Sequence, residues 1–160
     1  MSKRGIFILF LLFMGFTVSG QKIVPTPAEL YVDATEFIYS GDYYDALLIL
    51  VSLESKGYNT ANINYLIGEC YLNIQGQKTK SIPFLKAAVQ QISARYSGAT
   101  IEEESAPVKS LLYLGIAYRL NYEFDDAVKC FNDYIRSLDD TDRDNLRLAE
   151  FHMERCNHAR

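Results

Sequence analysis

The feature that most constrains this chain is a small residue that recurs at a fixed interval within amphipathic helical segments. Ala34 and Gly68 are 34 positions apart, and Gly115 and Ala149 are again 34 positions apart. A fixed internal period of this size is typical of proteins built from stacked copies of one supersecondary unit. The interval from Gly68 to Gly115 is 47 positions, 13 more than the period. We assign the excess to an insertion loop at 95–107, because RYSGATIEEESAP is polar, acidic and turn-like.

The clearest copy of the repeat spans residues 110–135. Two antiparallel helices that cross closely need residues without bulk at their contact, so we expect Gly115 and Ala127 at the crossing. Large apolar residues are expected around that contact. They are Leu111, Leu114, Tyr118, Phe131 and Tyr134.

Two weaker copies span residues 64–89 and 30–53. In the first of these, Pro83 falls in the first turn of the second helix, where its missing N–H has no intrahelical partner. In the 30–53 copy, Gly41 is expected to separate two helices and Gly57 to end the second. The segment 141–160 carries half a repeat, with one apolar stripe on a charged helix. Its members are Leu146, Ala149, Met153 and Cys156.

The pattern of these copies resembles the tetratricopeptide repeat family. In the 110–135 copy the matching residues read L-x-x-L-G-x-x-Y and then A-x-x-x-F. The resemblance implies an all-α fold of helix-turn-helix repeats, stacked as a short right-handed solenoid with a terminal capping helix. It places the repeats at about 27–60, 61–95 and 108–141. The remaining segment, 142–160, is interpreted as a polar cap on the stack or as half of a repeat whose continuation has been removed.

The resemblance also implies where a partner would bind. In the resembled family the first helices of the repeats line a concave groove. The residues of this chain at groove positions include Tyr31, Tyr39, Tyr65, Asn73, Lys109 and Arg119. The central Tyr65 is the strongest aromatic candidate, and Arg119 is a candidate for pairing with an acidic or C-terminal group. The alternative is that several of these tyrosines only pack against neighbouring helices.

A looser resemblance covers nearly the whole chain after residue 20. The chain is similar to the N-terminal repeat region of Gram-negative envelope proteins in which a β-propeller and an OmpA-like domain follow, some of them in secretion or gliding machinery. The resemblance rests on Gly20-Gln21, NINYLIGECYLN, the acidic insertion and the closing ERCNHA. The propeller and OmpA-like parts do not occur in these 160 residues, so no wall-anchoring function is carried over.

The N-terminus predicts export. Lys3 and Arg4 precede the apolar run 6–16, and small residues lead up to Gln21, a pattern typical of a secretory signal peptide over 1–20. The run is shorter than the about 20 apolar residues that span a bilayer, although an uncleaved anchor stays an alternative. We therefore expect a single domain over 21–160, in the periplasm or associated with the outer membrane.

The net charge and the absence of catalytic motifs argue against several classes of function. The formal net charge of −4 becomes −6 without residues 1–20, so nucleic-acid binding is not expected. The two histidines, His152 and His158, lie in the last segment, and no serine occurs in a nucleophile-elbow sequence. We therefore expect no enzymatic activity, cofactor or small-molecule substrate. Glu102–Glu104 is most simply a solvated loop, although a basic partner could use it.

Metal binding is also not expected. His152 and Cys156 are four positions apart on one helix face, but two ligands do not make a zinc site. The run Asp140–Asp144 imitates a calcium loop, but it is more simply a helix start. Cys70 and Cys130 are expected to be buried thiols, and Cys156 is expected to be the most accessible of the three because it lies near the end of the chain.

The sequence thus favours an exported all-α adaptor that binds a protein or peptide without catalysis. Peripheral association with an outer-membrane complex fits the same reading. The alternative is a structural module of a larger envelope assembly, which would use its outer surface instead of the groove.

Overall fold

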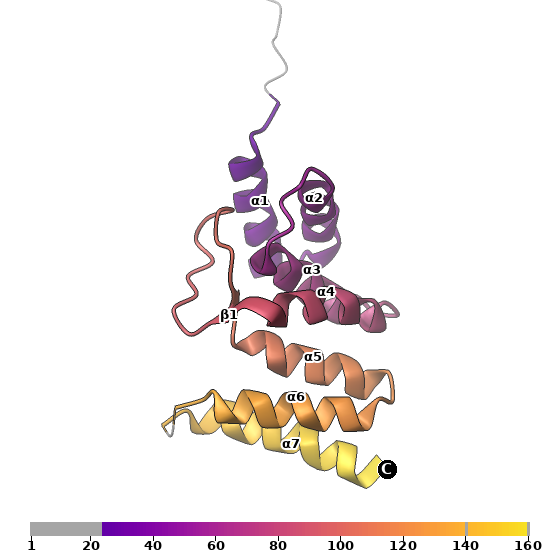
Figure 1. Ribbon diagram of the computed structural model, residues 1–160. Helices are drawn as coiled ribbons and strands as arrows, with labels where there is room; N and C mark the ends of the chain where they lie inside the picture. The colour runs from indigo at the N-terminus through magenta and orange to yellow at the C-terminus, as the bar shows by residue number, and fades with distance from the viewer. Residues whose placement is uncertain (1–23, 140, 160) are drawn as a thin grey trace, which may run out of the picture.

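The computed structural model describes residues 24–139 and 141–159, and these residues are mostly helical (Figure 1). The predicted signal peptide lies outside the described residues. The α-helices of the described part are α1 (Pro27–Ser40), α2 (Tyr43–Ser55), α3 (Ala61–Asn73), α4 (Ser81–Ala88), α5 (Lys109–Leu120), α6 (Phe124–Arg136) and α7 (Arg143–Ala159). The short elements are the 3-10 turns η1 (Lys78–Lys80) and η2 (Val89–Gln91) and the strands β1 (Ile92–Ser93) and β2 (Ala106–Pro107).

The helices follow one another through space in chain order. The antiparallel pairs α1–α2, α3–α4 and α5–α6 lie one after another, and α7 packs on α6 (Figure 1). The predicted all-α character is confirmed. The three pairs fall inside the ranges predicted for the three repeats, and α7 falls inside the range of the predicted cap. No helix in the described part of the chain is both long and apolar enough to cross a bilayer.

The helix ends follow from local chemistry. Thr26 and Glu29 form a reciprocal capping box at the start of α1, and the Thr60 side chain accepts a hydrogen bond from the Ile63 N–H in α3. Gly41 ends α1 with a φ of 87°, a left-handed conformation that glycine adopts without a steric penalty. Asp142 accepts from the Asn145 N–H at the start of α7, which is the helix-start role predicted for this acidic run.

The repeated glycines lie where two helices touch. A Cβ placed on Gly115 would lie 2.5 Å from the Phe131 ring of α6, and one on Gly68 would lie 2.6 Å from Leu85 of α4. Gly115 therefore faces the ring of Phe131, while Ala127 is fully buried one turn earlier in α6. The prediction that position 115 needs a residue without bulk agrees with this geometry.

The junction between α4 and α5 contains structure that the sequence did not indicate. β1 and β2 form a parallel pair, with Ile92 opposite Ala106 and Ser93 opposite Pro107. This pair brings together the two ends of the segment 94–105. The predicted insertion loop, 95–107, covers most of this segment and also includes β2. Pro83 is the third residue of α4, and the 3-10 turn η1 leads into that helix.

The cysteines require one correction. Cys70, Cys130 and Cys156 are all buried, as predicted for the first two. Cys156 was expected to be the most accessible, but it is completely buried. The reason is that Ala149 and Cys156, two helical turns apart, lie on the buried side of α7, and α7 packs on α6. Burial raises the pKa of Cys70 to about 12 and that of Cys130 to about 11, so both stay protonated thiols.

Candidate binding surfaces

The segment 94–105, called the covering loop from here on, lies against α1 and α3. Figure 1 shows it rising from β1 along the side of α1 before the chain returns to α5. Its Glu104 carbonyl accepts a hydrogen bond from the Ala61 N–H at the start of α3, 3.1 Å away. Ile101, in the middle of the loop, is almost completely buried. The covering loop is therefore a packed part of the fold.

A chain of hydrogen bonds through Asn62 joins α1, α3 and the covering loop. The Asn62 side-chain amide donates to the Tyr31 hydroxyl at 2.9 Å, and Tyr31 donates to the Gly98 carbonyl at 2.7 Å. On its other side, Asn62 accepts a hydrogen bond from the Tyr96 hydroxyl at 2.7 Å. Asn62 is fully buried, and a buried amide requires such partners. The covering loop thus provides the residues at both ends of this series of hydrogen bonds, Gly98 and Tyr96.

Aromatic rings continue this contact toward α5. Tyr65 of α3 meets the edge of Tyr96 at a centroid distance of 6.1 Å and stacks on Tyr113 of α5 at 5.9 Å. The Tyr113 hydroxyl donates to Glu69 at 3.0 Å, and the Lys109 ammonium lies 4.8 Å from the centre of the Tyr113 ring. These contacts connect α3, α5 and the covering loop through three tyrosines.

Burial raises the pKa of Tyr65, Tyr96 and Tyr113, and the Glu69 carboxylate nearby raises each of them further. Burial also raises the pKa of Tyr31. All four phenols are therefore neutral at physiological pH, so each hydroxyl keeps the proton that it can donate.

Glu103 holds the covering loop together from within. Its carboxylate accepts hydrogen bonds from the N–H and hydroxyl groups of both Ser105 and Ser97, the shortest being 2.6 Å from the Ser105 hydroxyl. The bonds from Ser105 hold the pKa of Glu103 below its usual value. The expectation of a simply solvated Glu102–Glu104 segment is therefore wrong for Glu103, although Glu102 and Glu104 are exposed.

The six predicted contact residues fall into different environments. Tyr31 and Tyr65 are buried beneath the covering loop, with 7 % of Tyr65 exposed. The alternative that some of these tyrosines pack inside the chain therefore describes these two. Tyr39, Asn73 and Lys109 are exposed, and 96 % of Tyr39 is accessible. A Tyr65→Ala change would remove a buried ring, so it would not isolate a contact with a partner.

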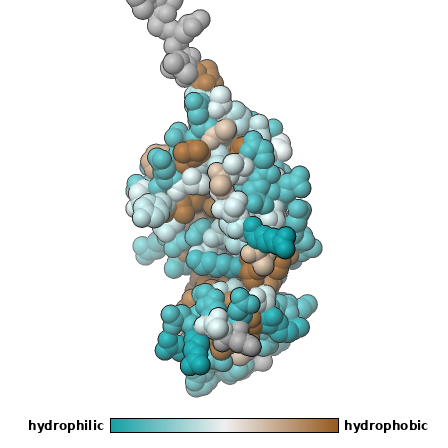
Figure 2. Space-filling view, turned by 90° about the vertical axis from the view of Figure 1, so that its left-hand side faces the viewer, coloured by the Kyte–Doolittle hydropathy of each residue, from teal (hydrophilic) through white to brown (hydrophobic). Residues whose placement is uncertain are grey.

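Figure 2 looks onto the covering-loop side of the molecule. Most of this face is hydrophilic or neutral, with scattered hydrophobic residues and a hydrophobic seam above the last helices. Sequence reasoning assigned Tyr31 and Tyr65 to a binding groove but did not single out Asn62, Tyr96 or Tyr113, which they contact. Tyr96 and Ile101, two large side chains within a largely polar loop, were the available signal that the loop packs onto the helices.

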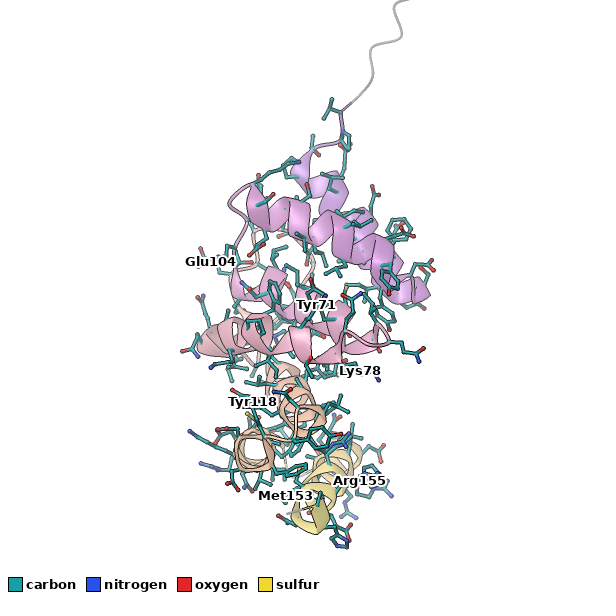
Figure 3. The ribbon with its side chains drawn as sticks, turned by 90° about the vertical axis from the view of Figure 1, so that its right-hand side faces the viewer. Tyr71, Lys78, Glu104, Tyr118, Met153 and Arg155 are labelled. Atoms are coloured by element: carbon teal, nitrogen blue, oxygen red, sulfur yellow. The ribbon has the colours of Figure 1, made fainter. Side chains whose placement is uncertain are left out.

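Arg119, the sixth predicted residue, lies on the opposite side of the molecule. The α5–α6 connection and the last turn of α7 meet there (Figure 1). A cavity of about 240 Å³ lies between them, and its walls include Arg119, Leu120, Tyr122, Phe124 and Arg155. Figure 3, which faces this side, marks Arg155 on α7. We call this cavity the turn-side pocket.

The charged groups around the turn-side pocket are incompletely paired. Within the described part of the chain, no ion pair joins Arg119 or Arg155 to an acidic residue. Arg155 lies over the Phe151 ring, 5.5 Å from its centre. The Nε of Arg119 and the Nδ1 of His152 are buried and have no hydrogen-bond partner. The Ser110 hydroxyl, at the opposite end of α5, is also buried without a partner.

His152 lies beside both arginines and between two aromatic rings. It stacks on Phe131 at a centroid distance of 5.7 Å and meets the edge of Phe151 at 5.5 Å. Burial, together with the positive charges of Arg119 and Arg155, lowers the pKa of His152 to about 4. His152 is therefore neutral at physiological pH.

A third surface is the outer side of α2. Tyr44, Leu48 and Val51 are exposed and follow one another at helical steps of four and three, so they form one apolar stripe, with Leu48 72 % exposed. Figure 1 shows α2 near the N-terminal end of the described residues. We call these three residues the α2 stripe.

No protein-family model matches this chain, and no curated protein matches it. Among residues 24–139 and 141–159, no three His, Cys, Asp or Glu side chains come close enough together to hold a metal ion.

Proposed function

We propose that this protein is an exported, non-catalytic adaptor of the tetratricopeptide type that binds a protein or peptide in the periplasm or at the outer membrane. The observation that carries the proposal is the repeated helix crossing, in which Gly68 faces Leu85 and Gly115 faces Phe131. Two helix pairs are thus built on the same contact. Stacked pairs of this kind present an extended surface, which repeat proteins use for binding.

The covering loop limits which of the predicted contact residues a partner can reach. Because Tyr31 and Tyr65 are covered, the remaining candidates are the exposed Tyr39, Asn73 and Lys109 and the turn-side pocket with Arg119. An extended partner that reaches several of these would bind through more than one helix pair.

The test is capture of a partner from an envelope extract of the organism that encodes the chain. The exported protein, carrying a C-terminal tag, is used as bait, and bound proteins are identified by mass spectrometry. We expect one or a few proteins that are retained by the unaltered bait and reduced with Tyr39→Ala or Arg119→Ala. Recovery of no specific protein, or recovery unaffected by either change, would contradict binding through these residues.

The α2 stripe supports a second candidate, a structural module held in a larger envelope assembly by its outer surface. An exposed row of Tyr44, Leu48 and Val51 is the kind of apolar surface that is covered in an assembly. Leu48→Glu would place a charge in that contact. Loss of assembly with Leu48→Glu, together with normal capture by Tyr39→Ala and Arg119→Ala, would favour the structural module over the adaptor.

A further inference from the structure

We infer that α7 pairs with the α7 of a second copy of this chain, so that the protein associates as an antiparallel, two-fold symmetric dimer. The inference goes beyond the proposed adaptor function, which neither requires nor predicts a second copy. It concerns an exposed face of α7, the helix at the end of the stack opposite α1 (Figure 1).

Four exposed residues follow one another along this face of α7. Asp144, Leu148, Phe151 and Arg155 are separated by steps of four, three and four positions, which return to the same side of a helix. Leu148 is 42 % exposed and Phe151 is 51 % exposed, although both are large apolar side chains. The two buried residues of α7 lie on a different side of the helix. We call the four exposed residues the α7 stripe.

The order of residues in the α7 stripe is self-complementary. The acidic Asp144 lies four positions before Leu148, and the basic Arg155 lies four positions after Phe151. In an antiparallel pair centred between Leu148 and Phe151, each leucine therefore meets the phenylalanine of the other copy. Each Asp144 then meets the Arg155 of the other copy. A two-fold axis forms both contacts twice, as the interface of a symmetric dimer requires.

The same residues disfavour a parallel pair. A parallel pair would place Asp144 opposite Asp144 and Arg155 opposite Arg155, and like charges that meet across an interface cost affinity. Burial of Leu148 and Phe151 supplies the attraction in either orientation. The charges at the two ends of the α7 stripe therefore select the antiparallel one.

Two further charges beside the α7 stripe fit the antiparallel pair. Arg147 and Glu154 are exposed and lie on the same flank of the stripe. In the inverted arrangement, Arg147 of one copy lies roughly 3 Å along the helix axis from Glu154 of the other. In the single chain, Arg147 pairs with Asp144 and Glu154 lies 3.7 Å from His158. Exposed pairs of this kind contribute little, so they can rearrange at small cost.

Arg155 has no acidic partner in the single chain. Among the described residues, no ion pair reaches it, and it lines the turn-side pocket together with Arg119. The positive charges of Arg119 and Arg155 repel each other. The Asp144 of a second copy would bring a carboxylate to this end of α7 and offset that repulsion.

The size of the contact sets its strength. α7 has 17 residues and is therefore about 25 Å long. Two helices of this length cover less than the about 800 Å² per partner that stable complexes bury. We therefore expect a dissociation constant of about 10 μM or weaker, with a fraction of dimer that depends on protein concentration.

Sedimentation equilibrium of the exported protein, over about a hundredfold range of concentration, measures this association. Asp144→Lys and Arg155→Glu each reverse one charge of the proposed pairs, and a third variant carries both changes. Leu148→Glu places a charge at the apolar centre of the α7 stripe. Glu150→Lys reverses an exposed charge on another side of α7 and is the matched control. Circular dichroism checks that each variant is folded.

We expect the unaltered chain to dimerise, and each single charge reversal to weaken dimerisation by about tenfold or more, because both symmetric pairs become repulsive. The double variant should regain the dimer, since opposite charges meet again. An equimolar mixture of the two single variants should form mixed dimers for the same reason. Glu150→Lys should associate as the unaltered chain does, and Leu148→Glu should stay monomeric.

A monomer at every concentration would overturn the inference and leave the α7 stripe to a different protein. A dimer that tolerates Leu148→Glu and both charge reversals would also overturn it, and loss of that dimer with Leu48→Glu would place the contact on the α2 stripe. Failure of the double variant to regain the dimer would overturn the antiparallel pairing. The adaptor proposal fails separately, when the unaltered bait captures no partner from the extract.

Discussion

The two sides of the molecule differ in how their buried polar groups are satisfied. On the covering-loop side, Tyr31, Asn62 and Tyr96 exchange hydrogen bonds with one another and with the loop backbone. On the turn side, Arg119 and His152 each keep a buried nitrogen without a partner. The Tyr31–Asn62–Tyr96 network is thus completed by the chain itself, whereas Arg119 lacks an acceptor. The Ser110 hydroxyl, at the start of α5, also has no partner. A surface predicted to bind a partner can therefore be filled instead by an insertion of the same chain.

Both sides of the molecule rest on the same helix packing, and Gly115→Leu, which disturbs that packing, is expected to have the largest effect. A side chain at position 115 would collide with the Phe131 ring, which is completely buried. We expect a loss of about 3 kcal/mol or more in the free energy of unfolding, measured in urea. Ala87→Leu adds similar bulk at an exposed position of α4 and serves as the control. Equal, small changes in both variants would mean that the crossing is not where the structure places it.

The second largest loss of stability is expected on the covering-loop side, for a change at Asn62. Asn62→Leu preserves the approximate volume but leaves the Tyr96 hydroxyl without its acceptor and Tyr31 without its donor. We expect the free energy of unfolding to fall by about 2 kcal/mol, since buried polar groups lose their partners. Asn73→Leu changes the same residue type at the exposed end of α3 and should cost less than about 0.5 kcal/mol. A loss as small as that of the control would show that the loop contributes little to the fold.

A smaller effect is expected within the covering loop. Glu103→Gln removes the carboxylate that accepts from Ser97 and Ser105, so trypsin should cleave after the exposed Arg95 more rapidly. Glu102→Gln removes a neighbouring exposed charge and should not change the rate. Because the pKa of Glu103 is lowered in the fold, its contribution is complete above its unfolded value of about 4.5 and is lost as the pH falls through the folded value. Equal cleavage rates at Arg95 in Glu103→Gln and in the unaltered chain, both measured at neutral pH, would contradict this role.

The smallest effect on stability is expected on the turn side, where His152 provides the readout. Its pKa of about 4 lies below the ordinary 6.5, so the unfolded chain binds the proton first and stability falls as the pH drops from about 6.5 to about 4. Arg155→Gln should raise the pKa of His152 and reduce that fall, with little effect at neutral pH. Resonance titration of His152 measures this, with the exposed His158 as an internal reference and Arg136→Gln as the control. An unchanged pKa of His152 in Arg155→Gln would mean that Arg155 does not lie close enough to influence His152, contrary to the geometry described for the turn-side pocket.

The sequence predicted those parts of the fold that depend on local spacing. Gly68 and Gly115 were identified because helix crossings recur at a fixed period, and Gly41 and Asp142 were identified because helix ends use particular residues. The tetratricopeptide assignment and the predicted export stay predictions.

The features that the sequence did not predict depend on contacts between distant segments. Tyr31 reaches Gly98, 67 positions away, and Tyr96 reaches Asn62, 34 positions away. No sequence periodicity indicates such pairs, because a loop has no regular geometry from which the surface that it packs against can be inferred. For the same reason, the sequence did not predict the burial of Cys156 or the proximity of Arg119 to Arg155. Both depend on how α7 packs on α6.

The parallel pairing of β1 with β2 also has a consequence for how this protein can be altered. Because Ile92 lies opposite Ala106, the covering loop leaves and re-enters the helix stack at one point. The direct packing of α4 on α5 and the strand pair therefore hold the two helices together whatever the length of the loop, and lengthening a closed loop costs little entropy. A reporter domain inserted between the exposed Ala99 and Thr100 would thus leave the register of the flanking helices unchanged, while it would disturb the contacts of the neighbouring Gly98 and Ile101.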